Sequence, residues 1–259
     1  MSDRSAVHPA AAEGFQAAAE VYQKSRPDYP AALADWLRDE LGLSTGKVVV
    51  DLGAGTGKFT TLVSATGARV IAVEPVAAMR AELVAAHPGV EALAGDACHL
   101  PLADAAVDAI VCAQAFHWFA APAALAEMRR ALKPGGALGL VWNVRDERVA
   151  WVAALTRIVD RYAGDAPRHE SGRWRDVFPA PGFTPLVERR FAYEHVGSAE
   201  RVIVERVLST SFIAALPAAE QGRVVEAVRA LIAATPSLAG RATVAYPYQT
   251  RAYACRKAG

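Results

Sequence analysis

The order of the short apolar runs constrains the fold of this chain more than any other feature. Five runs rich in valine, isoleucine, leucine and alanine follow one another, and helix-forming stretches separate them. The runs span residues 47–52, 70–73, 90–94, 107–113 and 137–142, and helices are predicted over 79–86 and 121–132. Strands that are apolar on both faces and alternate with helices are typical of a parallel sheet covered on both sides. The sequence therefore predicts a doubly wound α/β fold.

The segments on either side of these runs are patterned differently. Before them, helices are predicted around 15–22 and over 31–41, and the two prolines of residues 25–30 would end any helix between the two. After them, the pattern predicts helices over 151–162, 199–214 and 217–234, strands over 183–195 and 243–255, and a loop over 167–181. The two helices between the last two strands are expected to form a cap.

Composition argues against several classes of function. Lysine and arginine total 28 against 27 acidic residues, and the sequence has no basic stripe of the kind that binds nucleic acid. Three scattered cysteines predict neither a disulfide framework nor a metal site and fit a reducing compartment. The first residues lack the apolar core of a signal peptide, and no apolar run is long enough to span a bilayer. We therefore expect a cytoplasmic protein that binds neither nucleic acid nor membrane.

The first apolar run ends in a glycine-rich turn with the sequence Asp51-Leu52-Gly53-Ala54-Gly55-Thr56-Gly57-Lys58-Phe59. Glycine lacks a Cβ, so it permits both a sharp turn and the close approach of a ligand to the backbone. A P-loop would need four residues between its glycines and a serine or threonine after its lysine, but Gly53 and Gly57 enclose three and Phe59 follows Lys58. A dinucleotide-binding fingerprint would need glycine in place of Lys58, which weakens the prediction of an oxidoreductase without excluding it.

The turn resembles motif I of class I S-adenosylmethionine-dependent methyltransferases, D/E-x-G-x-G-x-G, at every position. The resemblance continues in order and spacing through Val73-Glu74-Pro75, Gly95-Asp96-Ala97 and the turn Leu132-Lys133-Pro134-Gly135-Gly136 before the fifth strand. It covers about residues 22–142. The resemblance implies a Rossmann-like sheet of about seven strands, mostly parallel with an antiparallel final strand, together with a helical cap.

The same resemblance implies S-adenosylmethionine as the cofactor and a set of residues that bind it. Glu74 would accept both ribose hydroxyls, Asp96 would accept the adenine amine, and Arg26 would pair with the cofactor carboxylate. The other implied residues are Tyr22, Asp51, Gly53, Ala54, Gly55, Thr56, Gly57, Pro75, Met79, Ala97, Gln114, Ala115 and Trp118. Residues 1–259 would form a single domain, divided into an arm and lid (1–45), a cofactor-binding core (46–143) and a substrate cap with the last strands (144–259).

Residues 113–119 and 22–30 are similar to a small-molecule branch that includes trans-aconitate methyltransferase-like and ubiquinone-type enzymes. Enzymes that methylate DNA amines or glutamine amides carry an Asn/Asp-Pro-Pro-Tyr box after the fourth strand, and residues 113–116 do not resemble it. The resemblance therefore implies methyl transfer to a small molecule, preferably at the oxygen of a carboxylate or hydroxyl, with nitrogen and carbon left open. A cofactor-binding protein without turnover and an NAD-dependent oxidoreductase remain as alternatives, and the oligomeric state is open.

His117 is the candidate catalytic residue, because it follows the fourth strand at the carboxyl edge where such sheets bind ligands. It would act as a base if the acceptor were an alcohol, and otherwise it would form part of the pocket wall. Asn143, Arg145 and Asp146 leave the fifth strand at the same edge and are candidates for binding the acceptor.

Two further expectations concern the second half of the chain. Residues 202–216 are expected to cover the carboxyl edge and face Phe116, His117 and Trp118. Their apolar side chains (Ile203, Val207, Leu208, Phe212 and Ile213) would favour an acceptor with an apolar body and one polar end. His169 and His195 are expected at the surface.

Overall fold

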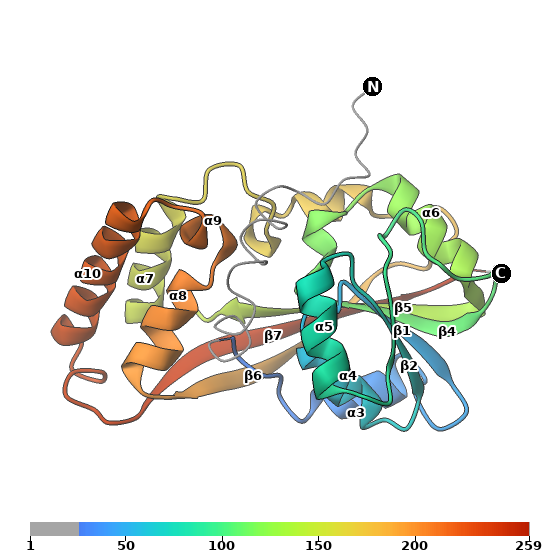
Figure 1. The fold of residues 1–259 in the computed structure, drawn as a ribbon, viewed down its shortest axis with the longest axis horizontal. Helices are drawn as coiled ribbons and strands as arrows, with labels where there is room; N and C mark the ends of the chain where they lie inside the picture. The colour runs from blue at the N-terminus through green and yellow to red at the C-terminus, as the bar shows by residue number, and fades with distance from the viewer. Residues whose placement is uncertain (1–25, 259) are drawn as a thin grey trace.

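A seven-stranded sheet with the strand order β3-β2-β1-β4-β5-β7-β6 forms the centre of the computed structural model, which describes residues 26–258 (Figure 1). The strands are β1 (Val48–Leu52), β2 (Arg69–Val73), β3 (Glu91–Leu93), β4 (Val107–Ala113), β5 (Leu132–Arg145), β6 (Val187–Gly197) and β7 (Val244–Arg256). Strands β1 to β5 pair in parallel, whereas β7 is antiparallel to both β5 and β6. This confirms the predicted sheet and its antiparallel final strand.

Helices cover both faces of the sheet and form the cap beyond its end. They are α3 (Leu33–Asp39), α4 (Lys58–Ser64), α5 (Ala77–Ala86), α6 (Pro122–Ala131), α7 (Ala150–Asp160), α8 (Arg206–Leu208), α9 (Ser211–Ala214) and α10 (Ala218–Ala234). Shorter helical turns are η1 (Phe116–Trp118), η2 (His169–Ser171), η3 (Arg173–Val177) and the π-helical η4 (Glu200–Glu205). The helix predicted around residues 15–22 lies outside the described residues.

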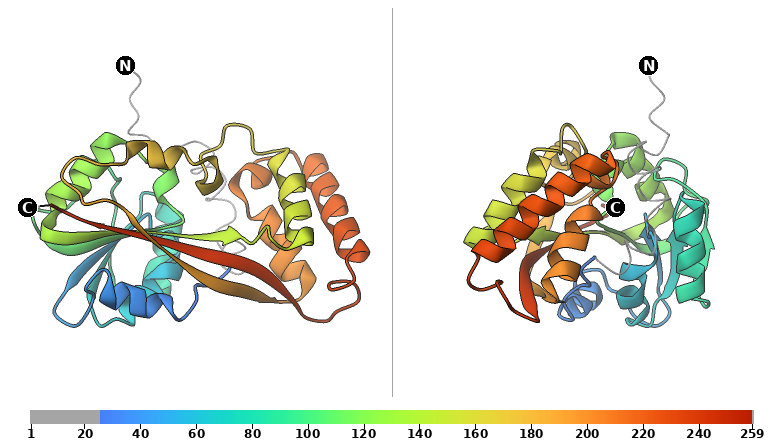
Figure 2. Two further views of the ribbon diagram at one scale, coloured as in Figure 1. Left: turned by 180° about the vertical axis from the view of Figure 1, so that it is seen from behind. Right: turned by 60° about the vertical axis from the view of Figure 1, so that its left-hand side comes forward.

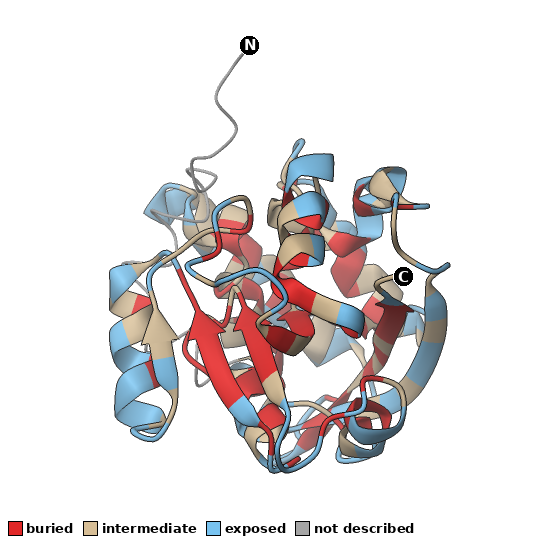
Figure 3. Cartoon of the chain, turned by 90° about the vertical axis from the view of Figure 1, so that its right-hand side faces the viewer, coloured by how far each residue is buried: buried red, intermediate tan, exposed pale blue. Residues whose placement is uncertain are grey.

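Alternate side chains of each central strand supply two separate cores. Val49 packs with residues of α3 and α4, whereas its neighbour Val50 packs with residues of α6 and η3. Both valines are fully buried, as expected for strands whose successive side chains point to opposite faces of a covered sheet. Figure 3 shows the buried strands between helices whose outer surfaces are exposed. This two-sided burial explains why the strands are apolar at nearly every position.

A third core holds the cap together. Side chains of α7, η4, α9 and α10 pack on the first part of β7, where Val244, Tyr246 and Tyr248 are buried. Figure 2 shows how β6 and β7 run from the central sheet out to these helices. The cap therefore rests on an extension of the sheet, at the edge where the parallel strands end.

Three elements differ from the sequence prediction. Strand β5 begins at Leu132, so the expected turn at 132–136 is an irregularity within the strand, where the register with β4 shifts. The helix expected over 199–214 is broken into η4, α8 and α9, and the Ser209 hydroxyl donates to the carbonyl of Arg206 (2.8 Å) near the break. Such side-chain bonds compete with the helical backbone pattern. The loop expected over 167–181 contains η2 and η3, which bury Trp174.

Candidate functional site

The glycine-rich turn joins β1 to α4 through three residues with left-handed backbone angles. The φ angles of Gly53, Gly55 and Gly57 are +70°, +58° and +84°, a region that side chains with a Cβ rarely adopt. A Cβ on Gly53 would also stand 2.7 Å from the Cβ of Ala115, the second residue after β4. The turn therefore needs glycine both for its backbone shape and for its close approach to the neighbouring strand end.

Glu74 closes this turn from the end of β2. Its Oε2 accepts the backbone N–H of Gly55 and its Oε1 accepts that of Val76, both at 2.9 Å. The side chain is 5% exposed, and burial raises the pKa of the carboxyl even though both amides act in the opposite direction. The geometry thus brings Glu74 against the glycine turn, and its contact with a ribose stays a prediction.

Asp51 is the second buried carboxyl at this edge. Its Oδ2 accepts the hydroxyl of Thr60 (2.7 Å), whereas its Oδ1 is buried without a hydrogen-bond partner among the described residues. Burial raises the pKa of Asp51 to about 7; the Thr60 hydroxyl lowers it, and the charge of Glu74 adds to the rise. Among residues 26–258, a Cβ on Gly55 would meet within 4 Å only the sulfur of Met79, at 3.8 Å. An unused buried acceptor next to an uncrowded glycine backbone fits a ligand with hydrogen-bond donors.

The remaining implied cofactor residues lie along the same edge, apart from Tyr22, which is outside the described residues. Asp96 follows β3, and its Oδ1 accepts the backbone N–H groups of Cys98 (2.7 Å) and His99 (3.0 Å). Ala54, Thr56, Met79, Ala97 and Ala115 are buried, whereas Pro75 is exposed. These positions agree with a cofactor lying across the ends of β1 to β4. The contact of each residue with the cofactor stays a prediction.

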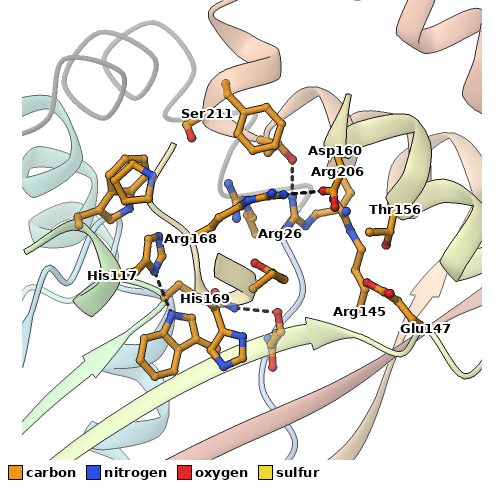
Figure 4. Close-up of a pocket in the computed structure, with 18 residues that line it drawn as sticks. Arg26, His117, Arg145, Glu147, Thr156, Asp160, Arg168, His169, Arg206 and Ser211 are labelled. Carbon is orange, nitrogen blue, oxygen red and sulfur yellow. Dashed lines mark hydrogen bonds and ion pairs between the residues drawn. The ribbon is translucent and has the colours of Figure 1, made fainter. Parts of the chain in front are cut away.

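A pocket of about 820 Å³, counted out to its open mouth, lies between this edge and the cap (Figure 4). It is lined by Arg26, Gln114, His117, Trp118, Trp142, Asn143, Arg145, Glu147, Thr156, Asp160, Pro167, Arg168, His169, Glu170, Arg206, Thr210, Ser211 and Phe212. Four of these residues are arginines and three are acidic. The pocket is therefore polar and carries more positive than negative groups.

The four arginines come from four different segments and differ in their partners. Arg168 forms an ion pair with Asp160 (2.6 Å), and Arg26 donates to the carbonyl of Ser209 in the cap (2.8 Å). Arg206 donates to the hydroxyl of Thr210 (3.2 Å), while its Nε is buried without a partner among the described residues. The side chain of Arg145 has no hydrogen bond or ion pair within the described part of the chain. Arg145 and Arg206 thus bring positive charge that no carboxylate pairs directly.

His117 is held by a specific hydrogen bond on the wall of this pocket. The indole N–H of Trp142, on β5, donates to its Nδ1 at 3.0 Å. Burial lowers the pKa of His117 to about 3, and the nearby His169 and Arg26 add to the effect. The imidazole is therefore neutral around pH 7.

His169 and His195 are buried, so the expectation of surface histidines was wrong. Each is 8% exposed, because η2 folds His169 against Trp142 and Trp174 and because β6 lies under the cap. Both ring nitrogens of His169 lack a partner among the described residues, and burial lowers its pKa to about 4. Sequence reasoning missed this residue as a lining group, since the surrounding loop has no periodic pattern.

Gln114 and Asn143 line the pocket at the sheet edge. Gln114 directly follows β4 with φ +57°, an unusual angle for a residue other than glycine, and such strained backbone is often found at functional sites. Asn143 donates to the carbonyl of Asp28 (2.9 Å) and accepts the hydroxyl of Thr250 (2.6 Å). The predicted candidate Asn143 therefore ties the segment after residue 25 to the sheet, whereas Asp146 pairs with Arg148 (2.6 Å) and does not line the pocket.

The cap meets the pocket with a different set of side chains from the one expected. Phe212 lines the pocket together with His117 and Trp118, as expected. However, Ile203, Val207 and Ile213 are buried in the core of the cap, Leu208 packs against that core, and Phe116 is buried under the sheet against Trp174. The prediction of an apolar pocket lining was therefore wrong, because most of these side chains fill the core of the cap.

Comparison with known proteins gives this architecture its context. A family profile described as "Methyltransferase domain" matches residues 50–140. An uncharacterised methyltransferase-like protein of Schizosaccharomyces pombe is 37% identical over 91% of this chain and 92% of its own length. This chain belongs to the methyltransferase family. It is a class I enzyme whose cofactor is S-adenosylmethionine, which removes the oxidoreductase alternative.

This chain is also similar to a solved structure and, over part of its length, to another methyltransferase. A structure from Anaeromyxobacter dehalogenans, assigned to the type II methyltransferases, has a TM-score of 0.62 and 23% identity, and the likeness covers 89% of this chain and 96% of that one. A malonyl-[acyl-carrier protein] O-methyltransferase of Methylococcus capsulatus is 36% identical over 44% of this chain and 43% of its own. Within residues 26–258, no helix is long and apolar enough to cross a membrane.

Proposed function

We propose that the methyltransferase transfers the methyl group to a carboxylate oxygen of a small acceptor bound in the pocket between sheet and cap. The observation that carries this proposal is the positive charge of Arg145 and Arg206, two half-buried lining residues that no carboxylate pairs directly. Guanidinium groups bind carboxylates with charge-assisted and often bidentate hydrogen bonds. An anionic acceptor would therefore find its partners already in place.

The acidic lining residues do not cancel this preference. Asp160 is paired with Arg168, and Glu147 and Glu170 are exposed. A protonated acceptor amine would be repelled by the arginines, and a wholly apolar acceptor would leave their charges without a partner. Polar groups on His169, Thr210 and Ser211 are further contacts for an acceptor that carries a second polar group.

S-adenosylmethionine supplies an electrophilic methyl group on a sulfonium when it is bound. We propose that Glu74, Asp96 and the glycine turn hold it along the ends of β1 to β3, with Gln114 and Trp118 between it and the acceptor. Arg145 and Arg206 would hold the acceptor carboxylate in line with the methyl carbon. Such positioning can supply several kcal/mol of the barrier reduction. The single-domain arrangement, with the cap closing over the core, belongs to the same proposal.

The partial relative from Methylococcus capsulatus supports oxygen as the methylated atom, since it is named a malonyl-[acyl-carrier protein] O-methyltransferase. The likeness covers less than half of this chain. The charge of the pocket therefore supports the proposal more strongly than this relative does. The small-molecule branch indicated by residues 113–119 is part of the same proposal.

The test is incubation of the purified protein with methyl-labelled S-adenosylmethionine and matched panels of small carboxylic acids, phenols and amines. We expect label in the acids, and mild alkali should release it as volatile methanol because a carboxyl methyl ester is base-labile. Transfer to phenols or amines in preference to acids would contradict the proposal, since ethers and methylamines keep the label in alkali.

Variants locate the acceptor in the pocket. Arg145→Gln is expected to raise KM for the acid by about tenfold or more, because a hydrogen bond to a charged group contributes about 1.5–3 kcal/mol. Arg148→Gln is the matched control, because Arg148 is exposed and paired with Asp146. An equal effect of both substitutions would show that general charge, and not the pocket, attracts the acceptor.

A further inference from the structure

The hydrogen bond between Trp142 and His117 fixes which nitrogen of the imidazole carries the proton. An indole nitrogen is a donor and has no lone pair to offer. Nδ1 of His117 must therefore accept, and in a neutral ring the proton then resides on Nε2. The distance of 3.0 Å is that of an ordinary N–H···N bond.

Trp142 is held too firmly to release this bond by rotating. It is 1% exposed, and its ring lies 4.6 Å from that of Trp174 and 5.0 Å from that of His169. Tyr253 packs edge-on against it at 5.9 Å. A side chain enclosed in this way has no second position, so Trp142 acts as a positioning residue for His117.

The surroundings of His117 oppose a second proton on the ring. A proton on Nδ1 would face the indole N–H directly, and the charged and titratable neighbours that face His117 are Arg26 and His169. The Nε2 edge has no hydrogen-bond partner among the described residues, and His117 lines the pocket. Figure 4 shows the His117 ring at the side of the pocket, with its hydrogen bond to the indole drawn as a dashed line.

We propose that His117 presents a permanent Nε2–H donor to the acceptor oxygen and is not a general base, so that the acceptor must enter the pocket already ionised. This inference rests on the proposed function and deepens it. It excludes alcohols as good acceptors and selects oxygens that are anionic at neutral pH. It also replaces the expectation that His117 would act as a base toward an alcohol acceptor.

The chemistry of a carboxylate acceptor needs no base. A carboxylate oxygen forms a bond to the methyl carbon while the carbon–sulfur bond breaks and its electron pair stays on sulfur. The sulfonium becomes a neutral thioether, the carboxylate becomes a neutral ester, and no proton is released. A donor on His117 would keep one oxygen lone pair occupied and so orient the other toward the methyl carbon.

The tautomer can be observed directly by long-range ¹H–¹⁵N NMR of the ¹⁵N-labelled protein with S-adenosylhomocysteine. We expect His117 as the Nε2–H tautomer, with no titration between about pH 5 and pH 8, where an unperturbed histidine would titrate. His117→Gln identifies the signals by their loss. An Nδ1–H tautomer, or protonation within this range, would overturn the proposal. This measurement needs no acceptor, so it stands apart from any failure of the acid panel.

Kinetics of two variants separate a donor from a base. His117→Gln keeps an N–H donor, and we expect its kcat/KM to stay within about tenfold of the parent, whereas His117→Ala should lose about tenfold or more because it has no donor. Both the parent and His117→Gln should show a level pH profile above the pKa of the acid. If His117 were a base, both variants would lose about 100-fold or more, and Gln would restore nothing.

Discussion

Replacing Asp51 by Asn should remove the contribution of this carboxyl to the pH dependence of the free energy of unfolding. Asp51 is fully buried at the end of β1, with one oxygen bonded to Thr60 and the other without a partner among the described residues. Burial raises its pKa from 3.8 to about 7. Between these values the unfolded chain has lost the proton while the folded protein keeps it. The folded state therefore binds more protons, and its stability falls as the pH rises through this window.

The size of the effect follows from the shift. Each pH unit of this window costs about 1.36 kcal/mol, so the two units from pH 5 to pH 7 amount to about 3 kcal/mol. Asn at this position cannot ionise, and its carbonyl can still accept the hydroxyl of Thr60. Its amide would lack a partner, at a cost of about 1–3 kcal/mol that does not vary with pH. The informative quantity is therefore the change in the difference between variant and parent.

Urea unfolding of both proteins without ligand, at pH 5 and at pH 8, measures this quantity. We expect the free energy of unfolding of the variant, relative to that of the parent, to increase by about 3 kcal/mol from pH 5 to pH 8. The lowered pKa values of His117 and His169 make stability rise as the pH increases toward 6.5, but they contribute equally to both proteins. Glu74, whose pKa is also raised, is present in both proteins, and its charge is part of what raises the pKa of Asp51 in the parent.

Asp35→Asn is the control, because the Asp35 side chain is 76% exposed. Its difference from the parent should stay level between the two pH values. A level difference for Asp51→Asn would refute the reasoning, since it would mean that the Asp51 carboxyl ionises in the folded protein as it does in the unfolded chain.

Three other substitutions test the remaining parts of the site. Glu74→Ala should weaken binding of S-adenosylhomocysteine by about 1–3 kcal/mol in calorimetry, because a buried charged acceptor is lost; unchanged affinity would remove Glu74 from the cofactor site. Gly55→Val should abolish this binding while circular dichroism still shows a folded protein, and retained binding would make the glycine purely structural. Phe212→Ala should change the order of preferred acceptors and leave cofactor affinity within about twofold, or roughly 0.4 kcal/mol; the reverse would place Phe212 at the cofactor.

The glycine turn and the carboxyls at the ends of β1, β2 and β3 could be predicted because they follow from the local sequence. A turn with three left-handed residues needs glycine at those positions, and a parallel sheet brings the carboxyl ends of its strands to one edge. The sequence therefore predicted that Asp51, Glu74 and Asp96 lie along that edge, as they do in the fold. The irregularity within β5 was missed, because Gly135 and Gly136 are as typical of a separate turn as of a bulge.

The polarity of the pocket could not be predicted, because an apolar pattern does not say what it packs against. The apolar side chains of residues 202–216 were expected to face the acceptor. In the fold, Ile203, Val207 and Ile213 pack with α7, α10 and the start of β7 instead. Arg206 and Thr210, four positions apart, are left on the side that faces the pocket. In the fold, the apolar face of this segment therefore packs inside the cap, and its polar face lines the pocket.

The same limit applies to His117, whose position could be predicted but whose chemistry could not. Strands β4 and β5 pair in parallel with Ala113 opposite Val141, so the chain just after β4 must run beside Trp142. That neighbourhood follows from the predicted sheet. The direction of the imidazole does not, because it depends on an indole 25 positions away along the chain. That single bond decides whether the residue can accept a proton. A histidine at the ligand-binding edge of a sheet therefore does not by itself indicate a base, because the hydrogen-bond partners of both ring nitrogens must also be known.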